Sequence, residues 1–460
     1  MTIRRTTAMA VSLLLTAGPL AGAQAAQTTS QLDSTMRVAE RAGFSGVVRI
    51  ERAGTVLLEK GYGFANRSEK IPFTAATIVQ IGSNTKDFTA VAILQLQQSG
   101  KLSLNDSIGK YFRDAPADKR DITIRQLMNH RAGFPHDIGK DFEPLSRGAF
   151  VTRAMQTKLL FAPGTRESYS NTGFGLLAAL IEQVTGTTYD VYVQRAILAP
   201  LDLHRTGVLL PGFKANELAH GYLARGTDNG TMLAKPHAED GPYWNLRGNG
   251  GMLSTAGDMH AFYKELFEGQ KLMTPATRAL RFNPDEPIGL AGSDGVDFFL
   301  YDRFPRMRME IIIASTNAAS RAPEIRRALG TVLGLPTPDG DAGEEVARRP
   351  GGKPAPAAFV NVLTELVSTI NSADTASIRS FIVAHFASEP GGPTVDERVR
   401  RFGEMHENLG GISIERLEMF DDGPFEMTLK SAQQGIVLVR VMADRAEPYR
   451  IHGMQVRLGG

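Results

Sequence analysis

Residues 81–90 read Ile-Gly-Ser-Asn-Thr-Lys-Asp-Phe-Thr-Ala, and they lead into a mostly apolar run that ends at Gln98. The pattern from Phe88 to Gln98 is helical and mostly apolar, which predicts a buried helix. Positions i and i+3 share a helical face, so Lys86 can reach the hydroxyl of Ser83. Burial disfavours a charged ammonium and lowers the lysine pKa, so Lys86 could act as a base. A serine at a helix N-terminus is also stabilised by the helix dipole as it becomes an alkoxide.

The spacing Ser-x-x-Lys is not specific by itself, because Ser107 and Lys110 repeat it. The sequence around Ser107 is polar and turn-like, and no buried helix follows it. The context therefore selects Ser83 as the candidate nucleophile.

A second motif lies in residues 163–173, which read Pro-Gly-Thr-Arg-Glu-Ser-Tyr-Ser-Asn-Thr-Gly. The Tyr169 phenol can shuttle a proton, and the Asn171 amide can hold a substrate carbonyl or the lysine. The tripeptide Tyr-x-Asn recurs at 243–245 and is weak alone. The longer string is specific, and it leads directly into an apolar helix predicted over 172–184.

Four strings in this order resemble the serine β-lactamase-related hydrolases, which include class C β-lactamases, D-alanyl-D-alanine carboxypeptidases, D-aminopeptidases and related esterases. The strings are residues 81–90, 127–135, 163–173 and 250–255. The resemblance covers roughly residues 31–335. It implies an α+β fold, in which an antiparallel sheet flanked by helices lies next to a mostly helical subdomain and the site lies between them.

The resemblance also implies roles for individual residues. Ser83 would be the acylated nucleophile, and Lys86 and Tyr169 would share the proton transfer. Asn171 would orient the substrate and Lys86. The backbone N–H of Ser83 would form one half of an oxyanion hole.

The third motif of the family, Lys-Thr-Gly or His-x-Gly on a strand, is altered in this chain. The best match is Leu290-Ala291-Gly292-Ser293, which keeps the glycine and offers the backbone N–H of Ser293 as the second oxyanion donor. Leu290 stands where the family has Lys or His, so a cationic clamp for a substrate carboxylate is missing. This favours an ester or a small amide over penicillin or a peptidoglycan peptide as substrate. The alternative is that the motif is misaligned.

Two further residues are candidates for the pocket. Tyr243 lies shortly before the glycines at 250–251, and its alternative role is loop packing. Arg247 could replace the missing carboxylate clamp, and its alternative is a solvated loop arginine.

The composition limits the remaining chemistry. The chain has 460 residues, no Cys and a formal net charge of +2. Without cysteine, the chain lacks cysteine nucleophiles, thiolate metal sites and disulfides. The charge argues against nucleic-acid binding. Gly-x-Ser-x-Gly, P-loop and His-Glu-x-x-His motifs are missing too. No metal or cofactor is expected, and the expected partner is a small-molecule or peptide substrate.

Residues 1–25 have the pattern of a secretory signal peptide. Arg4 and Arg5 precede an apolar stretch over about 8–20, and small residues around Ala25 suit cleavage. The apolar stretch is too short to span a membrane. We therefore expect an exported protein, periplasmic or extracellular, with no integral membrane span in the mature chain.

The rest of the chain divides into two predicted domains. Residues 26–335 form the hydrolase-like domain, and 336–356 have the Pro, Gly and charge content of a linker. Residues 357–460 form a small α+β domain with three helices and then a run of strands. This order of elements resembles that of nuclear-transport-factor-2-like domains.

These observations lead to two hypotheses of function. The first is an exported serine hydrolase that cleaves an ester or amide through an acyl-enzyme on Ser83. The second is a non-catalytic β-lactamase-like protein that binds cell-wall peptides or other ligands, which the altered third motif and the extra domain motivate. The oligomeric state stays open.

Overall fold

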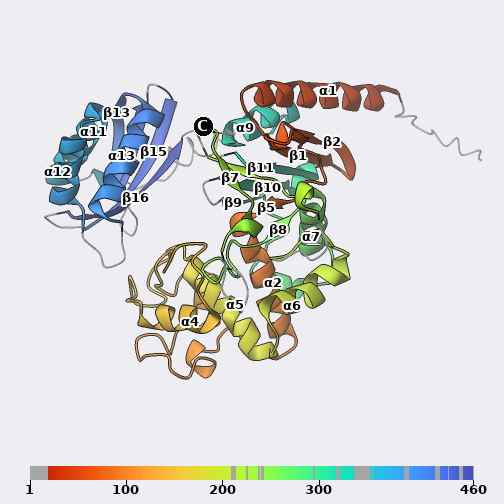
Figure 1. Ribbon diagram of the computed structural model, residues 1–460, viewed down its shortest axis with the longest axis horizontal. Coiled ribbons are helices and arrows are strands. Elements are labelled where there is room, and N and C mark those ends of the chain that lie inside the picture. The colour runs from red at the N-terminus through yellow and green to blue at the C-terminus, as the bar shows by residue number, and fades with distance from the viewer. Residues whose placement is uncertain are drawn as a thin grey trace, which may run out of the picture. The chain divides into compact units, whose positions relative to one another are not determined.

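The structure is a computed structural model of the chain (Figure 1). It describes residues 19–208, 214–223, 226–236, 239, 243–293, 296–317, 322–335, 353–354, 356–387, 393–419, 425–431, 433, 435–444 and 449–458. Most of the predicted signal peptide, residues 1–18, and most of the predicted linker lie outside these ranges. The chain forms two compact units, which divide between Ala322 and Pro323. This division falls earlier than the predicted start of the linker.

The first unit is built on a five-stranded antiparallel sheet. Its order is β2 (Thr55–Tyr62), β1 (Gly46–Arg52), β11 (Met309–Ser315), β10 (Phe298–Phe304) and β9 (Ile288–Ser293). Residues 46–51 and 55–60 are strand-like, and Arg52-Ala53-Gly54 between them has turn composition, which predicts a hairpin. The structure confirms this hairpin, and Ala53 and Gly54 take positive φ at its turn. Because β1 pairs with β11, strands from the two ends of this unit lie side by side.

Each face of the sheet is covered by helices (Figure 1). On one face, Lys60 and Tyr62 bond through their side chains to Asp33 of α1 (Pro19–Arg41). The sequence of residues 31–42 predicts a short helix, and the observed helix begins well before them. On the other face, Tyr301 of β10 stacks on Tyr263 of α7 (Ala256–Glu268). The predicted α+β architecture of an antiparallel sheet flanked by helices is therefore confirmed.

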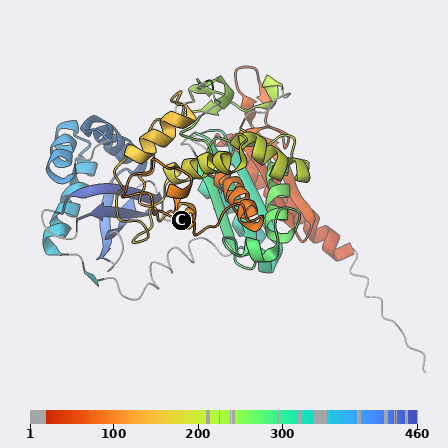
Figure 2. The ribbon, with the colours of Figure 1, turned by 90° about the horizontal axis from the view of Figure 1, so that it is seen from below.

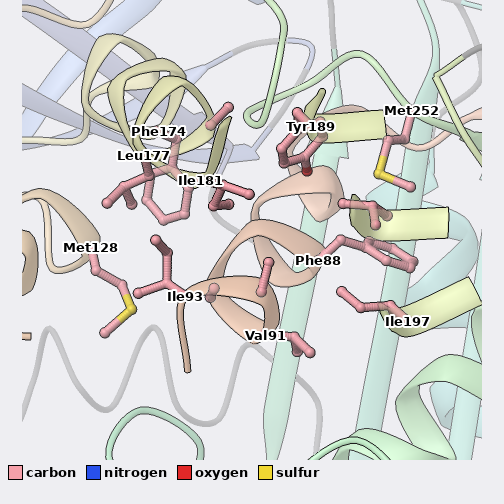
Figure 3. Packing of buried hydrophobic residues seen from close by; sticks show 14 of the residues in the cluster. Phe88, Val91, Ile93, Met128, Phe174, Leu177, Ile181, Tyr189, Ile197 and Met252 are labelled. Atoms are coloured by element: carbon pink, nitrogen blue, oxygen red, sulfur yellow. The ribbon is translucent and has the colours of Figure 1, made fainter. Parts of the chain in front are cut away.

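Helix α2 (Thr85–Gln98) runs through the core of the first unit. Its side chains Phe88, Val91 and Ile93 are fully buried (Figure 3). They belong to one hydrophobic cluster with Phe174, Leu177 and Ile181 of α5 (Asn171–Thr185). Figure 2 shows the orange α2 ribbon beside the strands of the sheet. A helix buried on all sides explains the nearly continuous apolar sequence after Lys86.

Shorter elements complete the first unit. Its helices are α3 (Ile124–Met128), α4 (Arg147–Gln156), α6 (Tyr189–Val193), α7 (Ala256–Glu268) and α8 (Pro275–Arg278). Its small two-stranded sheets pair β3 (Phe64–Asn66) with β4 (Ile71–Pro72), β5 (Val79–Gln80) with β8 (Leu253–Ser254), and β6 (Gly221–Tyr222) with β7 (Asp228–Gly230). Helix α9 (Ala322–Leu333) begins at the division between the units. No helix in the described ranges is both long and apolar enough to cross a membrane.

The second unit has its own hydrophobic core. Three helices, α11 (Ala357–Ser372), α12 (Thr375–His385) and α13 (Val395–Leu409), precede most of an antiparallel sheet. The sheet order is β12 (Lys353–Pro354), β13 (Ile412–Met419), β14 (Phe425–Ser431), β15 (Gly435–Ala443) and β16 (Ile451–Leu458). The predicted order of helices and then strands is confirmed. Strand β12 lies within the residues predicted as the linker. Its two residues pair with Glu418 and Met419 of β13, and they therefore belong to this sheet.

Candidate active site

The candidate nucleophile lies on a tight turn that leads into α2. Residues Gly82–Asn84 form a short 3₁₀ turn, and α2 follows from Thr85. Gly82 has φ +50, and a Cβ there would lie 2.7 Å from the backbone nitrogen of Ser293. A glycine is therefore required both for its conformation and for the close approach of β9. Ser83 is half-buried at this helix N-terminus.

Lys86 forms three contacts through its amine. The Nζ atom lies 3.1 Å from Ser83 Oγ, 2.7 Å from Asn171 Oδ1 and 2.7 Å from the carbonyl oxygen of Asn249. The two oxygens at 2.7 Å can only accept hydrogen bonds. A neutral amine would give them its two N–H groups and turn its lone pair towards Ser83. This arrangement suits Lys86 to receive the Ser83 proton.

The environment of Lys86 favours the neutral amine. Burial lowers the pKa of Lys86 to about 7, although the charges of Asp137 and Asp87 act in the opposite direction. A substantial fraction of the amine is therefore neutral near pH 7, as a general base requires.

Tyr169 approaches the same hydroxyl from the other side. Its OH donates to Ser83 Oγ at 2.7 Å, and its ring lies 4.7 Å from Lys86 Nζ. Burial raises the pKa of Tyr169 to about 12, so the phenol keeps its proton at neutral pH. His130 stacks on this ring at 4.5 Å and accepts the backbone N–H of Ser170. Burial lowers the pKa of His130 to about 4, so this neutral ring serves to position Tyr169.

Asn171 links Lys86 to an aspartate, Asp137, that no sequence motif indicated. Its Nδ2 donates to Asp137 at 2.8 Å, which fixes Oδ1 towards Lys86. Burial raises the pKa of Asp137, but its hydrogen bond and ion pair with His136 and the bond from Asn171 outweigh burial, and the pKa lies below its ordinary value. The sequence indicates Asp137 only indirectly. If the oxygen of Asn171 accepts a hydrogen bond from Lys86, the amide nitrogen of Asn171 needs an acceptor nearby. The Asn249 carbonyl gave no signal, since every residue carries one.

This geometry predicts the pH dependence of activity. Because only the neutral amine can accept a proton, a hydrolysis that uses Lys86 as its base should become faster as the pH rises through the Lys86 pKa of about 7. The Asp137 charge raises that pKa, so Asp137→Asn should move the acid limb to lower pH, while the substituted amide keeps an oxygen acceptor for Asn171. A pH profile of kcat/KM measures this shift, and a limb that stays in place or moves to higher pH would contradict it.

Strand β9 brings the predicted third motif to the nucleophile turn. A Cβ on Gly292 would lie 2.2 Å from the Ile81 carbonyl oxygen and 2.5 Å from the Ser83 nitrogen. Gly292 is thus confined to glycine by close packing, and the neighbouring Ser293 backbone lies beside Gly82. Leu290 is half-buried and packs against the main core, so β9 carries an apolar side chain at the position that the resemblance matches to the Lys or His of the family.

The two predicted pocket residues lie in the core instead. Tyr243 is 1% exposed, and its OH donates to the Met232 carbonyl. Arg247 is also 1% exposed and pairs with Asp190 at 3.1 Å. Arg247 is therefore neither a carboxylate clamp nor a solvated arginine, because it is buried itself and pairs with the half-buried Asp190. Tyr243 packs its loop in the interior, as the alternative prediction for this residue states.

Comparisons with known proteins identify the family of the chain. The family model described as Beta-lactamase matches residues 32–308, more than half of the chain. Protein flp of Staphylococcus aureus (strain COL) is 35% identical over 197 residues, which cover 41% of this chain and 39% of that protein. Penicillin-binding protein 4* of Bacillus subtilis (strain 168) is 26% identical over 274 residues, 56% of this chain and 59% of that protein. Both matches span less than two thirds of the relative's length.

A solved structure shows the same fold over most of the chain. The crystal structure of SurE aligns with a TM-score of 0.62 and 18% identity, covering 95% of this chain and 98% of that chain. The resemblance inferred from four short strings is therefore confirmed by the family model and by the fold. The chain belongs to the β-lactamase family.

Proposed function

We propose that the protein is a serine hydrolase that cleaves an ester or a small amide through an acyl-enzyme on Ser83. The observation that carries this proposal is the pair of contacts on Ser83 Oγ, from Lys86 at 3.1 Å and from Tyr169 at 2.7 Å. A nucleophile, a base with a pKa near neutrality and a second proton carrier thus meet at one atom.

The proposed reaction has two halves. In the first, Ser83 Oγ bonds to the substrate carbonyl carbon while its proton passes to Lys86 Nζ. The bond to the leaving group then breaks, and the leaving group takes a proton from the Lys86–Tyr169 pair. In the second, water attacks the acyl carbon, the pair receives the water proton, and the acid leaves as Ser83 regains its hydrogen.

The oxyanion in both halves needs donors that point at one place. The proposal assigns this role to the backbone N–H groups of Ser83 and Ser293. The close packing of Gly292 and Gly82 supports this assignment, since it brings both backbones together. The start of α2 adds the positive end of a helix dipole.

Leu290 points to substrates without a carboxylate next to the reacting carbonyl. A half-buried apolar side chain on β9 offers such a carboxylate neither a charge nor a hydrogen bond. A substrate carboxylate at this place would lose its hydration without gaining a partner. An ester or amide with a neutral leaving group avoids this free-energy cost. This separates the proposed activity from penicillin hydrolysis.

The substitution Leu290→Lys tests this view of specificity. A lysine can pack its stem where Leu290 packs and extend its ammonium to solvent. We expect kcat/KM for a carboxylate-bearing penicillin to rise about tenfold relative to a neutral p-nitrophenyl ester, from an interaction worth about 1.4 kcal/mol. Leu290→Met, which adds no charge, is the control. An unchanged ratio would contradict the proposed role of this position.

Export is part of the proposal. Arg4, Arg5, the apolar stretch after them and the small residues near Ala25 support a cleaved signal. A relative named penicillin-binding protein fits a site of action outside the cytoplasm. N-terminal sequencing of protein recovered from the culture medium or periplasm tests this, and an intact Met1 on exported protein would contradict cleavage.

A substrate panel tests the function as a whole. We expect turnover of p-nitrophenyl esters or D-amino-acid amides by the wild type and loss of turnover in Ser83→Ala. Hydrolysis that persists in Ser83→Ala would overturn the proposal. Equal thermal stabilisation of both proteins by a cell-wall peptide, with no hydrolysis, would instead identify the non-catalytic binding protein.

A further inference from the structure

The nucleophile turn has a second polar face that the reaction above does not use. Asn84 and Asp87 are three residues apart, as Ser83 and Lys86 are, and they are joined through Tyr263 of α7. Asn84 Nδ2 donates to Tyr263 OH at 2.7 Å, and Tyr263 OH donates to Asp87 Oδ2 at 2.8 Å. A carboxylate only accepts, so the phenol gives it its single proton and must accept from the asparagine.

All three side chains are buried. Tyr263 is fully buried, and Asn84 and Asp87 are nearly so. Burial raises the pKa of Asp87 to about 6, while the Tyr263 hydrogen bond and the charge of Arg281 lower it. Polar groups at this depth are costly unless their bonds are satisfied. The bonds of Asn84 Nδ2, Tyr263 and Asp87 therefore define the geometry of the network, and Asn84 Oδ1 is the one oxygen of these three side chains that is buried without a partner among the described residues.

The same network reaches strand β9. This strand lies at one end of the sheet and pairs with β10. Asn84 Nδ2 also lies 3.4 Å from the Leu290 carbonyl oxygen, and a Cβ on Gly292 would come within 2.7 Å of Asn84 Oδ1. Tyr263 in turn stacks on Tyr301 of β10 at 4.0 Å. Asn84 and Tyr263 thus contact both the nucleophile turn and the two strands at that end of the sheet.

We propose that Asn84, Tyr263 and Asp87 form a positioning network that holds β9 against the nucleophile turn, so that the N–H groups of Ser83 and Ser293 face one carbonyl oxygen. This rests on the proposed function. The side chain of Leu290 cannot form a hydrogen bond across the site. The buried network instead aligns the backbone of β9 with the nucleophile turn. These residues are positioning residues, because they act on the substrate through the backbone of other residues.

The test compares an ester with its thionoester in wild type and Tyr263→Phe. Sulfur is larger and a weaker acceptor than oxygen, so an aligned pair of N–H donors favours the ester, and misalignment removes that preference. For Tyr263→Phe we expect kcat for the p-nitrophenyl ester to fall about 10–100-fold, with KM little changed and the thionoester rate within about threefold of wild type. Asn84→Ala, which removes the other end of the contact, should give the same pattern, and the double variant should be no worse than either single variant.

Tyr189→Phe is the matched control. Tyr189 is equally buried, and its OH bonds to Thr89 on the same helix α2. The Tyr189→Phe variant should lose about as much stability as Tyr263→Phe. It should keep the wild-type ratio of kcat for the ester to kcat for the thionoester. If Tyr263→Phe and Asn84→Ala lower both substrates equally, or act additively, the network is only structural and the proposal is overturned. Failure of a fluorophosphonate to label Ser83 in wild type would overturn the proposed function itself, and this inference with it.

Discussion

Lys86→Met should lower kcat/KM for a p-nitrophenyl ester by about 10³-fold or more, while the protein stays folded. Methionine matches the length of the lysine stem but has no lone pair to take the Ser83 proton. General-base catalysis is worth about 10²–10⁴-fold, and this lysine also holds Asn171 in place. Steady-state kinetics and a thermal melt on the same preparation measure the two effects.

Lys110→Met is the control for this prediction. Lys110 has the same spacing from Ser107, but it is exposed and pairs with Asp106 at 2.9 Å. Its substitution should leave kcat/KM unchanged. A Lys86→Met enzyme that keeps more than about a tenth of wild-type activity would show that Lys86 is not the base.

Gly292→Ala should lower kcat by about 100-fold. The added methyl group would lie 2.2 Å from the Ile81 carbonyl oxygen and 2.5 Å from the Ser83 nitrogen, so β9 and the nucleophile turn must separate. Such overpacking displaces backbone, and loss of one oxyanion donor costs about 10²–10³-fold in rate. Kinetics with the ester and the thionoester measure whether the loss is specific to the oxyanion.

Gly289→Ala on the same strand is the matched substitution. Among the residues that the structure describes, a Cβ there would come within 4 Å of only the end of the Asp302 side chain, at 3.0 Å. We expect activity within a few-fold of wild type. If the two variants lose activity equally, general disruption of β9 explains the result, and the oxyanion role of this strand is contradicted.

The sequence predicted the local parts of this site because their geometry is local. Ser83 and Lys86 meet through one helical turn, and the apolar residues after them predicted a buried helix that the structure confirms. Tyr169 lies far along the chain, and only the resemblance to a family placed it near Ser83. The hairpin at 46–60 followed from two short strand patterns around Ala53-Gly54.

Partners fixed by tertiary structure escaped prediction. Arg247 resembled a loop arginine, yet it is buried in the core and pairs with the half-buried Asp190, and no sequence pattern links the two. Asp137 and the Asn249 carbonyl complete the Lys86 site from separate loops. Strand β12 has only two residues, too few for a periodic pattern, and pairing with β13 alone defines it. The likeness of the second unit to nuclear-transport-factor-2-like domains stays a prediction.

The most direct test of the central claim is the mass of the protein after reaction with a fluorophosphonate, followed by peptide mapping. We expect one adduct per chain, located on Ser83. We also expect no adduct in Ser83→Ala and much slower labelling in Lys86→Met. An adduct on Ser107 or another serine, or equal labelling of wild type and Ser83→Ala, would contradict the assignment of Ser83 as the nucleophile.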